Sequence, residues 1–316
     1  MMRQTVLVLG GGPDAEREVS LDSSRGVAEA LRQGERFEVE YREIDRLEQD
    51  ELGALRGDVI FPVLHGPWGE GGPLQELLAR DERPFVGVGP GSARLAMDKV
   101  ATKTIASTSG VPVTPTAVFN PGDAVCPLAL PVVCKPVHEG SSVCLTLVRS
   151  REQWAEAQNA MSADLADRPE RIYMIEPLIE GLELTVGIVC GRPLPIVQIK
   201  PADGVYDYQA KYHRDDTKYV VAPGLPPGRT EQIVDAAMRI AGALGAGELA
   251  RVDFMLDRAG RPWLLEVNTM PGFTSHSLLP MAARASGMSM TQLCERLVES
   301  AVARRHRAGR PAAEVA

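Results

Sequence analysis

RVDFMLDRAGRPWLLEVNTMPGFTSHSL, the segment Arg251–Leu278, carries the pattern on which the fold and the function of this chain depend. Residues 251–256 alternate between two faces with a period of two, and residues 262–268 do the same. Between them lies Asp257–Gly260 (DRAG), which is a turn signal. The segment therefore predicts a β-hairpin, and we expect Asp257 to pair with Pro262.

The predicted register gathers polar groups on one face of the hairpin. Asp253 would face Glu266 and Arg251 would face Asn268, with Leu264 on the same face. Two carboxylates and an amide oxygen suit Mg²⁺, which takes its other ligands from phosphates and water, whereas zinc prefers nitrogen and sulfur. Acids directly opposite each other repel, and a cation would relieve that cost. The alternative is a solvated hairpin face with chance charge pairing.

The composition is that of a globular protein of two or three domains. The chain has 316 residues, of which 44% are hydrophobic and 24% charged, and no apolar run approaches the length of a membrane span. A net charge of −8 argues against a nucleic-acid partner, which would require a basic face. Five scattered cysteines form no C-x-x-C pair, so we expect reduced thiols and a cytoplasmic protein.

The N-terminal part of the chain alternates between strand and helix patterns. Strands are expected at Thr5–Leu9, Val59–Leu64 and Phe85–Val88, and helices at Ser20–Arg32 and Pro73–Leu78. This order predicts a parallel α/β sheet with functional groups in the loops that follow the strands.

The glycine-rich loop Gly10–Glu16 (GGGPDAE) follows the first expected strand and invites comparison with a dinucleotide-binding fingerprint. It lacks the G-x-G-x-x-G spacing, and no clear ribose-binding acid follows. We therefore interpret the loop as a tight turn that presents Glu16, and a nicotinamide-dependent dehydrogenase is disfavoured.

Three further features suggest a nucleotide site. Lys135 ends an apolar strand and is followed by Glu139–Ser142, whose backbone N–H groups could bind phosphate; the alternative is a strand-end lysine that reaches solvent. Glu176 and Glu183 flank a short linker and could bind a purine amino group and a ribose hydroxyl, although linker acids are usually solvated. The polar, aperiodic segment 202–219 is long enough to act as a lid.

The ordered occurrence of six such stretches resembles the ATP-grasp carboxylate–amine ligases, and within them the D-alanine–D-alanine ligase family, along nearly the whole chain. The stretches are Gly10–Ser20, Leu64–Gln75, Met97–Lys99, Lys135–Val143, Tyr206–Tyr212 and Arg251–Leu278. The resemblance implies an α/β (α+β) ATP-grasp fold whose central and C-terminal parts sandwich ATP. It divides the chain into an N-terminal α/β substrate domain (1–96), a central subdomain (97–184), a C-terminal subdomain with metal site and lid (185–308) and a flexible tail (309–316).

The resemblance also implies a reaction. Two D-alanines and ATP would give D-alanyl-D-alanine, ADP and phosphate through a D-alanyl phosphate, for peptidoglycan precursor synthesis. Two Mg²⁺ ions, with Mn²⁺ as an alternative metal, would assist. The family is commonly homodimeric and works on small molecules in the cytoplasm, without a membrane or nucleic-acid partner.

Residue roles follow from the matched motifs. The resemblance assigns ATP binding to Lys99, Lys135, Ser141, Glu176, the Leu178 backbone, Glu183 and Lys211. It assigns metal binding to Asp253, Glu266 and Asn268. Substrate binding and catalysis fall to Glu16, Ser141 and Tyr212 as a linked set, to His65, to Arg251 and the Gly272 N–H at the oxyanion, and to Ser277 and the Leu278 backbone at the second carboxylate.

Three positions depart from the family pattern. Gly71 stands where an acid is usual, Cys144 where a glycine is usual, and Val205 where an aromatic side chain often stacks near adenine. None of these changes removes a group that does chemistry. Two alternatives to dipeptide synthesis stay open: a related ligase that uses D-serine or D-lactate as acceptor, and a nucleotide-binding protein without turnover.

Overall fold

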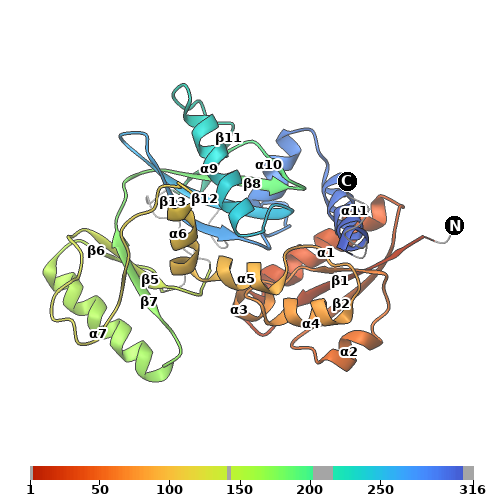
Figure 1. The fold of residues 1–316 in the computed structure, drawn as a ribbon, viewed down its shortest axis with the longest axis horizontal. Helices are drawn as coiled ribbons and strands as arrows, with labels where there is room; N and C mark the ends of the chain where they lie inside the picture. Colours follow the sequence, from red (N-terminus) through yellow and green to blue (C-terminus); the bar gives the residue numbers. More distant parts are fainter. Residues whose placement is uncertain (1–2, 141–143, 202–215, 309–316) are drawn as a thin grey trace.

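The structure, a computed structural model, describes residues 3–140, 144–201 and 216–308. Three sheets are formed by successive parts of the chain. In Figure 1 the first (red to orange) lies at the right, the second (yellow to green) at the left, and the third (green to blue) between and above them. The mixture of parallel and antiparallel sheets with covering helices agrees with the expected α/β class.

The first sheet is parallel, as predicted. Its strands, in the order β2-β1-β3, are β1 (Thr5–Gly11), β2 (Glu38–Ile44) and β3 (Val59–Pro62). Its helices are α1 (Arg17–Gln33), α2 (Gln49–Ala54), α3 (Gly66–Gly69), α4 (Pro73–Asp81) and α5 (Pro90–Met97). The predicted strand Phe85–Val88 is wrong, because only Phe85 pairs, through a single bridge to Ile60. Sequence periodicity also missed β2, whose residues are mostly half-buried or exposed.

The second sheet is antiparallel. Its strands, in the order β4-β7-β5-β6, are β4 (Ala117–Val118), β5 (Val132–Pro136), β6 (Thr146–Val148) and β7 (Tyr173–Pro177). Helix α7 (Arg151–Asp167) covers it, capped by the Ser150 hydroxyl, and buries Trp154 edge-on against Phe119. This small core supports the strands that carry Lys135 and Glu176.

The third sheet carries the hairpin. Its strands are β8 (Gly181–Val189), β9 (Arg192–Pro193), β10 (Val197–Lys200), β11 (Lys218–Val221), β12 (Leu249–Asp257) and β13 (Pro262–Asn268), in the order β11-β10-β8-β12-β13 with β9 paired to β8. Helices α6 (Lys99–Thr108) and α9 (Arg229–Ala243) contribute apolar residues to the same buried cluster as β8, β12 and β13.

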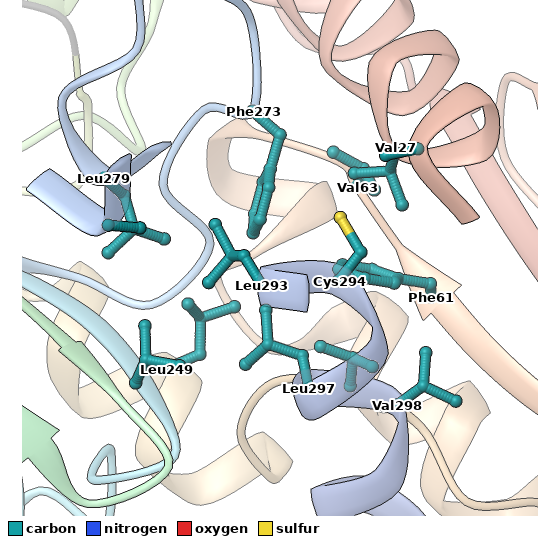
Figure 2. Packing of buried hydrophobic residues seen from close by; sticks show 14 of the residues in the cluster. Val27, Phe61, Val63, Leu249, Phe273, Leu279, Leu293, Cys294, Leu297 and Val298 are labelled. Carbon is teal, nitrogen blue, oxygen red and sulfur yellow. The ribbon is translucent and has the colours of Figure 1, made fainter. Parts of the chain in front are cut away.

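The last helix returns to the first sheet, and the helix before it packs against the third (Figure 1). Helices α10 (Leu278–Ala285) and α11 (Met290–Ala308) belong to one cluster with β1, β3 and α1. Figure 2 shows Leu293, Cys294 and Leu297 of α11 beside Phe61 and Phe273. Hydrophobic clusters therefore join parts of the chain that are distant in sequence, and the domain ranges given above stay a prediction. Among the described residues, no helix has the length and apolar content to cross a membrane.

The hairpin has the predicted pairing at its functional end and a different one at its turn. Asp253 pairs with Glu266 and Arg251 with Asn268, as expected, but Pro262 pairs with Leu256 rather than with Asp257. The register shifts between Asp253 and Phe254, so that Phe254 pairs with Leu264. A bulge of this kind inserts one residue and moves later side chains to the other face. Leu264 is therefore buried with Phe254, and its predicted position beside Glu266 is wrong.

Close packing of α1 on β1 explains one of the N-terminal glycines. A Cβ on Gly10 would lie 1.9 Å from Ser24 Oγ and 2.6 Å from Ser24 Cβ. We expect Gly10→Ala to lower the free energy of unfolding by about 1–3 kcal/mol, because it overpacks this contact. Adding Ser24→Gly should recover most of the loss, although glycine in a helix itself costs about 0.5–1 kcal/mol.

Urea-unfolding midpoints would measure both effects. Gly53→Ala is the matched control, since a Cβ there meets nothing within 4 Å. If the losses of stability caused by Gly10→Ala and Ser24→Gly simply add in the double variant, the contact with Ser24 is not what destabilises Gly10→Ala.

Candidate active site

The polar face of the β12–β13 hairpin brings together both predicted metal-binding acids. Asp253 and Glu266 are cross-strand partners, and Arg251 lies opposite Asn268. Asp253 is buried; it accepts a 2.5 Å hydrogen bond from the Thr185 hydroxyl and a 2.8 Å bond from Arg251 Nη2. Arg251, two residues away on the same strand face, thus offsets part of the negative charge, and Thr185 was not anticipated from the sequence.

Lys99 links this face to the second sheet. The Asp98 carboxylate accepts hydrogen bonds from two backbone N–H groups of the first turn of α6 and so fixes the helix end that carries Lys99. The buried ammonium of Lys99 donates to the Glu139 carbonyl oxygen at 2.5 Å and lies 3.4 Å from Glu266 Oε2. One cation therefore joins the glycine–serine loop to the acid pair, where the resemblance expects a phosphate.

The oxygens of Asp253, Glu266 and Asn268 have the chemistry that Mg²⁺ prefers, with two carboxylates and one amide. The described residues contain no group of three or more His, Cys, Asp or Glu side chains that could hold a metal. Mg²⁺ commonly takes its remaining ligands from phosphates and water. Asn268 Oδ1 accepts the Met270 N–H at 3.0 Å, which orients the amide. The donor set therefore fits the predicted metal.

The expected base-binding region is dominated by charge. Lys135 on β5 and a second lysine, Lys103, both contact the buried carboxylate of Glu176 on β7. Burial alone would raise the pKa of Glu176, but the two lysine charges outweigh it and hold the pKa at about 2. The Leu178 N–H donates to Pro131 O at 3.0 Å, so a bond from that N–H to adenine would have to replace or share this one.

Glu183, the predicted ribose ligand, lies on β8, in the same sheet as the acid pair. It is half-buried and pairs across the sheet with Met255 on β12 and Ile199 on β10. Its place on β8 follows the short linker after β7, so Glu176 and Glu183 come from two different sheets.

The residues predicted to bind the first substrate come from two loops that follow strands of the first sheet. Glu16 directly precedes α1, and a Cβ on Gly140 would lie 3.4 Å from Glu16 Oε2. The Glu16 carboxylate thus approaches the residue before Ser141. His65 is buried, and its Nε2 has no hydrogen-bond partner among the described residues. Burial lowers the pKa of His65, while the charge of Glu16 opposes this effect.

Asp14 ties these two loops together. Its Oδ2 accepts the backbone N–H groups of Trp68 and Gly69 at 2.8 and 3.3 Å. Burial raises the pKa of Asp14, and the two hydrogen bonds oppose the rise. The glycine-rich loop is therefore a turn that leads into α1 and carries Glu16, and Asp14 fixes it to the backbone of the second loop.

Glu70 is a site residue that sequence analysis missed. It is 7% exposed, and its carboxylate accepts the N–H groups of Gly66 at 3.3 Å and Met270 at 3.2 Å, which joins the first sheet's loop to the segment after β13. Burial and the charge of Glu16 raise the pKa of Glu70 to about 8. The sequence offers only a glutamate between glycines, and nothing in that pattern reveals burial.

The segment after β13 packs closely around Gly272. A Cβ there would lie 2.7 Å from the hydroxyl oxygen of Ser277, the residue directly before Leu278 and α10. The Ser23 hydroxyl on α1 accepts the Phe273 N–H at 3.0 Å and fixes the segment to the first sheet. The three predicted residues Gly272, Ser277 and Leu278 are therefore brought together.

The remaining predicted residues divide into two groups. Ser141, Lys211, Tyr212 and Val205, with most of the expected lid, lie outside the described residues. At Gly71 a Cβ would meet Pro67 O at 2.3 Å, which leaves no room for the usual acid; Gln75 instead caps α4 through the Gly72 N–H. Cys144 has φ 55°, in the left-handed region that favours glycine, which accounts for the usual residue at that position.

Comparisons with known proteins agree with this geometry. Residues 114–299 match the family model described as D-ala D-ala ligase C-terminus. The D-alanine–D-alanine ligase of Alkalilimnicola ehrlichii is 42% identical over 314 residues, covering 97% of this chain and 96% of that protein. Among solved structures, D-alanine–D-alanine ligase from Bacillus anthracis complexed with ATP has a TM-score of 0.80 at 26% identity, covering 97% of this chain and 100% of that one. VanG D-Ala:D-Ser ligase from Enterococcus faecalis has a TM-score of 0.78 at 25% identity, covering 95% and 100%.

The raised pKa of Glu70 has a consequence for stability. A carboxyl group whose pKa rises on folding favours the folded state when protonated, so its contribution is present below about pH 4.5 and is lost as the pH rises through about 8. Glu70→Gln removes this titration. We expect the melting temperature of the variant, relative to the parent protein, to be at least ~2 °C higher at pH 9 than at pH 5.

Scanning calorimetry at both pH values would measure the difference. The control is Glu29→Gln, an exposed glutamate on α1. A relative melting temperature for Glu70→Gln that stays constant between pH 5 and pH 9 would contradict the assigned pKa.

Proposed function

The chain belongs to the D-alanine–D-alanine ligase family, and from this premise we propose that it joins two D-alanines into D-alanyl-D-alanine with ATP as phosphoryl donor. The product would serve peptidoglycan precursor synthesis. The fold is that of the family, the ATP-grasp fold, and the chain covers the relatives almost completely. The curated D-alanine–D-alanine ligase that is 42% identical matches this chain along nearly its whole length, which favours the dipeptide.

One observation carries the proposal: Lys99 connects the glycine–serine loop with the acid pair on the hairpin. Its ammonium binds Glu139 O and lies 3.4 Å from Glu266, whose cross-strand partner is Asp253. Buried cations and acids this close together suit a triphosphate and its metal ion. Without such partners, burial of each of these charged side chains would be costly.

The chemistry has two steps. In the first, a carboxylate oxygen of one D-alanine attacks the γ-phosphorus of ATP, the bond to the β-phosphate oxygen breaks, and ADP leaves. Lys99, Lys135 and Lys211 offset charge on the phosphates. Asp253, Glu266 and Asn268 would hold Mg²⁺, which when bound neutralises charge that develops on the phosphoryl oxygens.

In the second step, the neutral amine of the other D-alanine attacks the acyl carbon, the carbon–oxygen bond to phosphate breaks, and phosphate leaves with the proton that the nitrogen loses. Arg251 and the Gly272 N–H stabilise the oxyanion. Ser277 and the Leu278 backbone hold the carboxylate of this second substrate. An acyl phosphate hydrolyses when water reaches it, so the expected lid over the site must exclude water.

Recognition of the first D-alanine rests on Glu16 and His65. The Glu16 carboxylate would bind the substrate ammonium, linked to Ser141 and Tyr212. The buried Nε2 of His65 has no partner among the described residues, which leaves it a hydrogen bond to make to the substrate. Glu16 lies beside Gly140, at the junction between the first and second sheets, and its charge acts on His65.

The proposal also covers the co-substrate and metal ions, the oligomeric state and the cellular compartment. ATP is the co-substrate, and a structural neighbour is complexed with ATP. Two Mg²⁺ ions, with Mn²⁺ as an alternative, complete the site. A homodimer in the cytoplasm is proposed by analogy with the family; the five free cysteines support a reducing compartment.

The first test is coupled ADP release with ATP, Mg²⁺ and D-alanine, with L-alanine as control and the product identified by mass. We expect ADP release only with D-alanine and a product with the mass of the dipeptide. Turnover that requires D-serine or D-lactate as acceptor would overturn the substrate assignment. Binding of ATP without turnover on any acceptor would overturn the catalytic assignment.

A second test addresses the metal ligands. Glu266→Gln should lower kcat at least ~100-fold and raise the Mg²⁺ concentration needed for half-maximal activity, since several kcal/mol of charge stabilisation depend on this carboxylate. Steady-state ADP release over a magnesium titration measures both, and Glu231→Gln, an exposed glutamate on α9, is the control. Near-parent kcat with an unchanged magnesium dependence would show that Glu266 is not a ligand.

A further inference from the structure

Lys103 is a buried lysine to which no function has been assigned so far. It lies one turn beyond Lys99 on α6, so both ammonium groups project from the same side of the helix. The Lys103 side chain is 4% exposed. Its Nζ donates to the Thr114 hydroxyl at 2.7 Å and to Glu176 Oε2. The Thr114 hydroxyl also donates to Glu176 Oε2, at 2.8 Å.

Two lysines share a single acid at this point. Lys103 and Thr114 contact Oε2 of Glu176, whereas Lys135 contacts Oε1. No other charged group contacts this carboxylate among the described residues; Lys99 acts on Lys103 at longer range. Burial lowers the pKa of Lys103, and the charge of Glu176 opposes this effect. A buried ammonium is tolerated only when an anion and hydrogen bonds compensate for lost water, and both are present here.

The presence of two lysines at one carboxylate has a physical reason if Lys135 also binds the nucleotide phosphates. A lysine that moves to a phosphate leaves its former carboxylate partner, and a buried carboxylate without a counter-ion is strongly disfavoured. Lys103 cannot make the same move without breaking its bonds to Thr114 and Glu176. One lysine is therefore exchangeable and the other is fixed.

We propose that Lys103 is the positioning residue of the nucleotide-base pocket: with Thr114, it holds Glu176 as an ionised carboxylate whose Oε1 accepts a hydrogen bond from the exocyclic amino group of adenine. The inference rests on the proposed ATP-dependent function. When Lys135 turns to the phosphates, Oε1 is released for the base while Oε2 keeps its two donors. Lys103 itself does not touch the nucleotide.

This arrangement selects the base through protonation state. An ionised carboxylate is an acceptor only, so it suits the amino group at C6 of adenine and repels the carbonyl oxygen at C6 of hypoxanthine. A protonated carboxyl can donate instead, and it would accept hypoxanthine. Discrimination between ATP and ITP therefore reports the charge of Glu176.

The test compares binding of ATP and ITP by calorimetry between pH 6 and pH 9, together with KM and kcat. In the parent protein Glu176 is ionised over this whole range, because its pKa is about 2. In Lys103→Met the pKa of Glu176 rises, since burial is no longer opposed by this charge. We expect ATP affinity at pH 6 to fall about 10- to 100-fold, with the loss shrinking toward pH 9 as the carboxyl ionises.

Three further readouts separate this role from general damage. The preference for ATP over ITP should fall at pH 6 in Lys103→Met, KM for D-alanine should stay within about twofold, and Lys103→Arg should restore ATP binding by keeping the cation. Lys200→Met, an exposed lysine at the end of β10, is the matched control. Unchanged ATP affinity and ATP-to-ITP preference in Lys103→Met at pH 6 would overturn the proposal.

A variant with paired substitutions covers the case in which Lys103→Met does not fold. Lys103→Met with Glu176→Gln removes Lys103 and its counter-ion together, so neither is left buried without the other, and we expect this variant to fold. Lys135, whose side chain is 12% exposed, loses its partner there as it does in Glu176→Gln alone, so the two variants are matched. We expect the paired variant to bind ATP and ITP as Glu176→Gln alone does; an additional independent loss would overturn the proposal. Nucleotide binding can be measured without D-alanine. If the parent protein shows no ligase activity, but ATP binding by Lys103→Met still depends on pH as expected, the proposed function is rejected and the role of Lys103 is not.

Discussion

Like charges that must be held close together are the constraint around which this molecule is built. Asp253 and Glu266 lie opposite each other on one hairpin, and mutual repulsion makes such a pair costly unless positive charge is near. Arg251 supplies one cation from the same strand and Lys99 another from α6. The loop from the second sheet is then held by Lys99 in turn, through the Glu139 carbonyl. The requirement to compensate two acids thus links the second and third sheets.

Backbone packing sets where this electrostatic centre can form. Helix α1, which begins directly after Glu16, lies so close to β1 that Gly10 has no space for a side chain. The Ser23 hydroxyl of the same helix holds the Phe273 N–H beyond β13. Figure 2 shows Phe273 at the same packed interface as Phe61 of β3 and Leu297 of α11. The segment around Phe273 and the helix that follows Glu16 are thus positioned by one hydrophobic core, formed from both ends of the chain. The hairpin that carries the acid pair packs mainly in a second core.

Sequence patterns predicted those parts of the molecule in which local alternation decides the outcome. The pairing of Asp253 with Glu266 followed from period-two spacing and from a turn at Asp257–Gly260. The bulge did not follow, because the position of Leu264 depends on packing against α6 and α9, which a single strand's sequence does not contain. The same reason explains why Phe85–Val88 resembles a strand in sequence: its residues are mostly buried, but only Phe85 pairs, with Ile60, and the carbonyl oxygens of Phe85 and Gly87 accept hydrogen bonds from the Arg304 side chain.

Resemblance to a family extended the prediction to residues such as Lys99 and Glu176, whose roles no local pattern could define. It did not extend to Glu70, Thr185 or Lys103, because their importance arises only from the neighbours that folding brings to them. Glu70 approaches Met270, two hundred residues away in sequence, and Lys103 approaches Glu176 from a different secondary-structure layer. Burial of a charged residue is invisible to composition and spacing.

Two buried glutamates show that charged neighbours can either reinforce or reverse the effect of burial on the pKa of a carboxyl group. Burial acts in the same direction on both, since loss of water disfavours the ionised form of any carboxyl. Glu70 faces another acid, Glu16, and two backbone N–H groups, and its pKa rises to about 8. Glu176 faces two ammonium groups and a hydroxyl, and its pKa falls to about 2. At neutral pH the first is a neutral acid that fastens a loop, and the second is a permanent anion. A ligase that must distinguish an ammonium, a phosphate and a purine within one site needs fixed and opposite charge states. In this chain the charge state of each glutamate is set by the groups that surround its carboxylate.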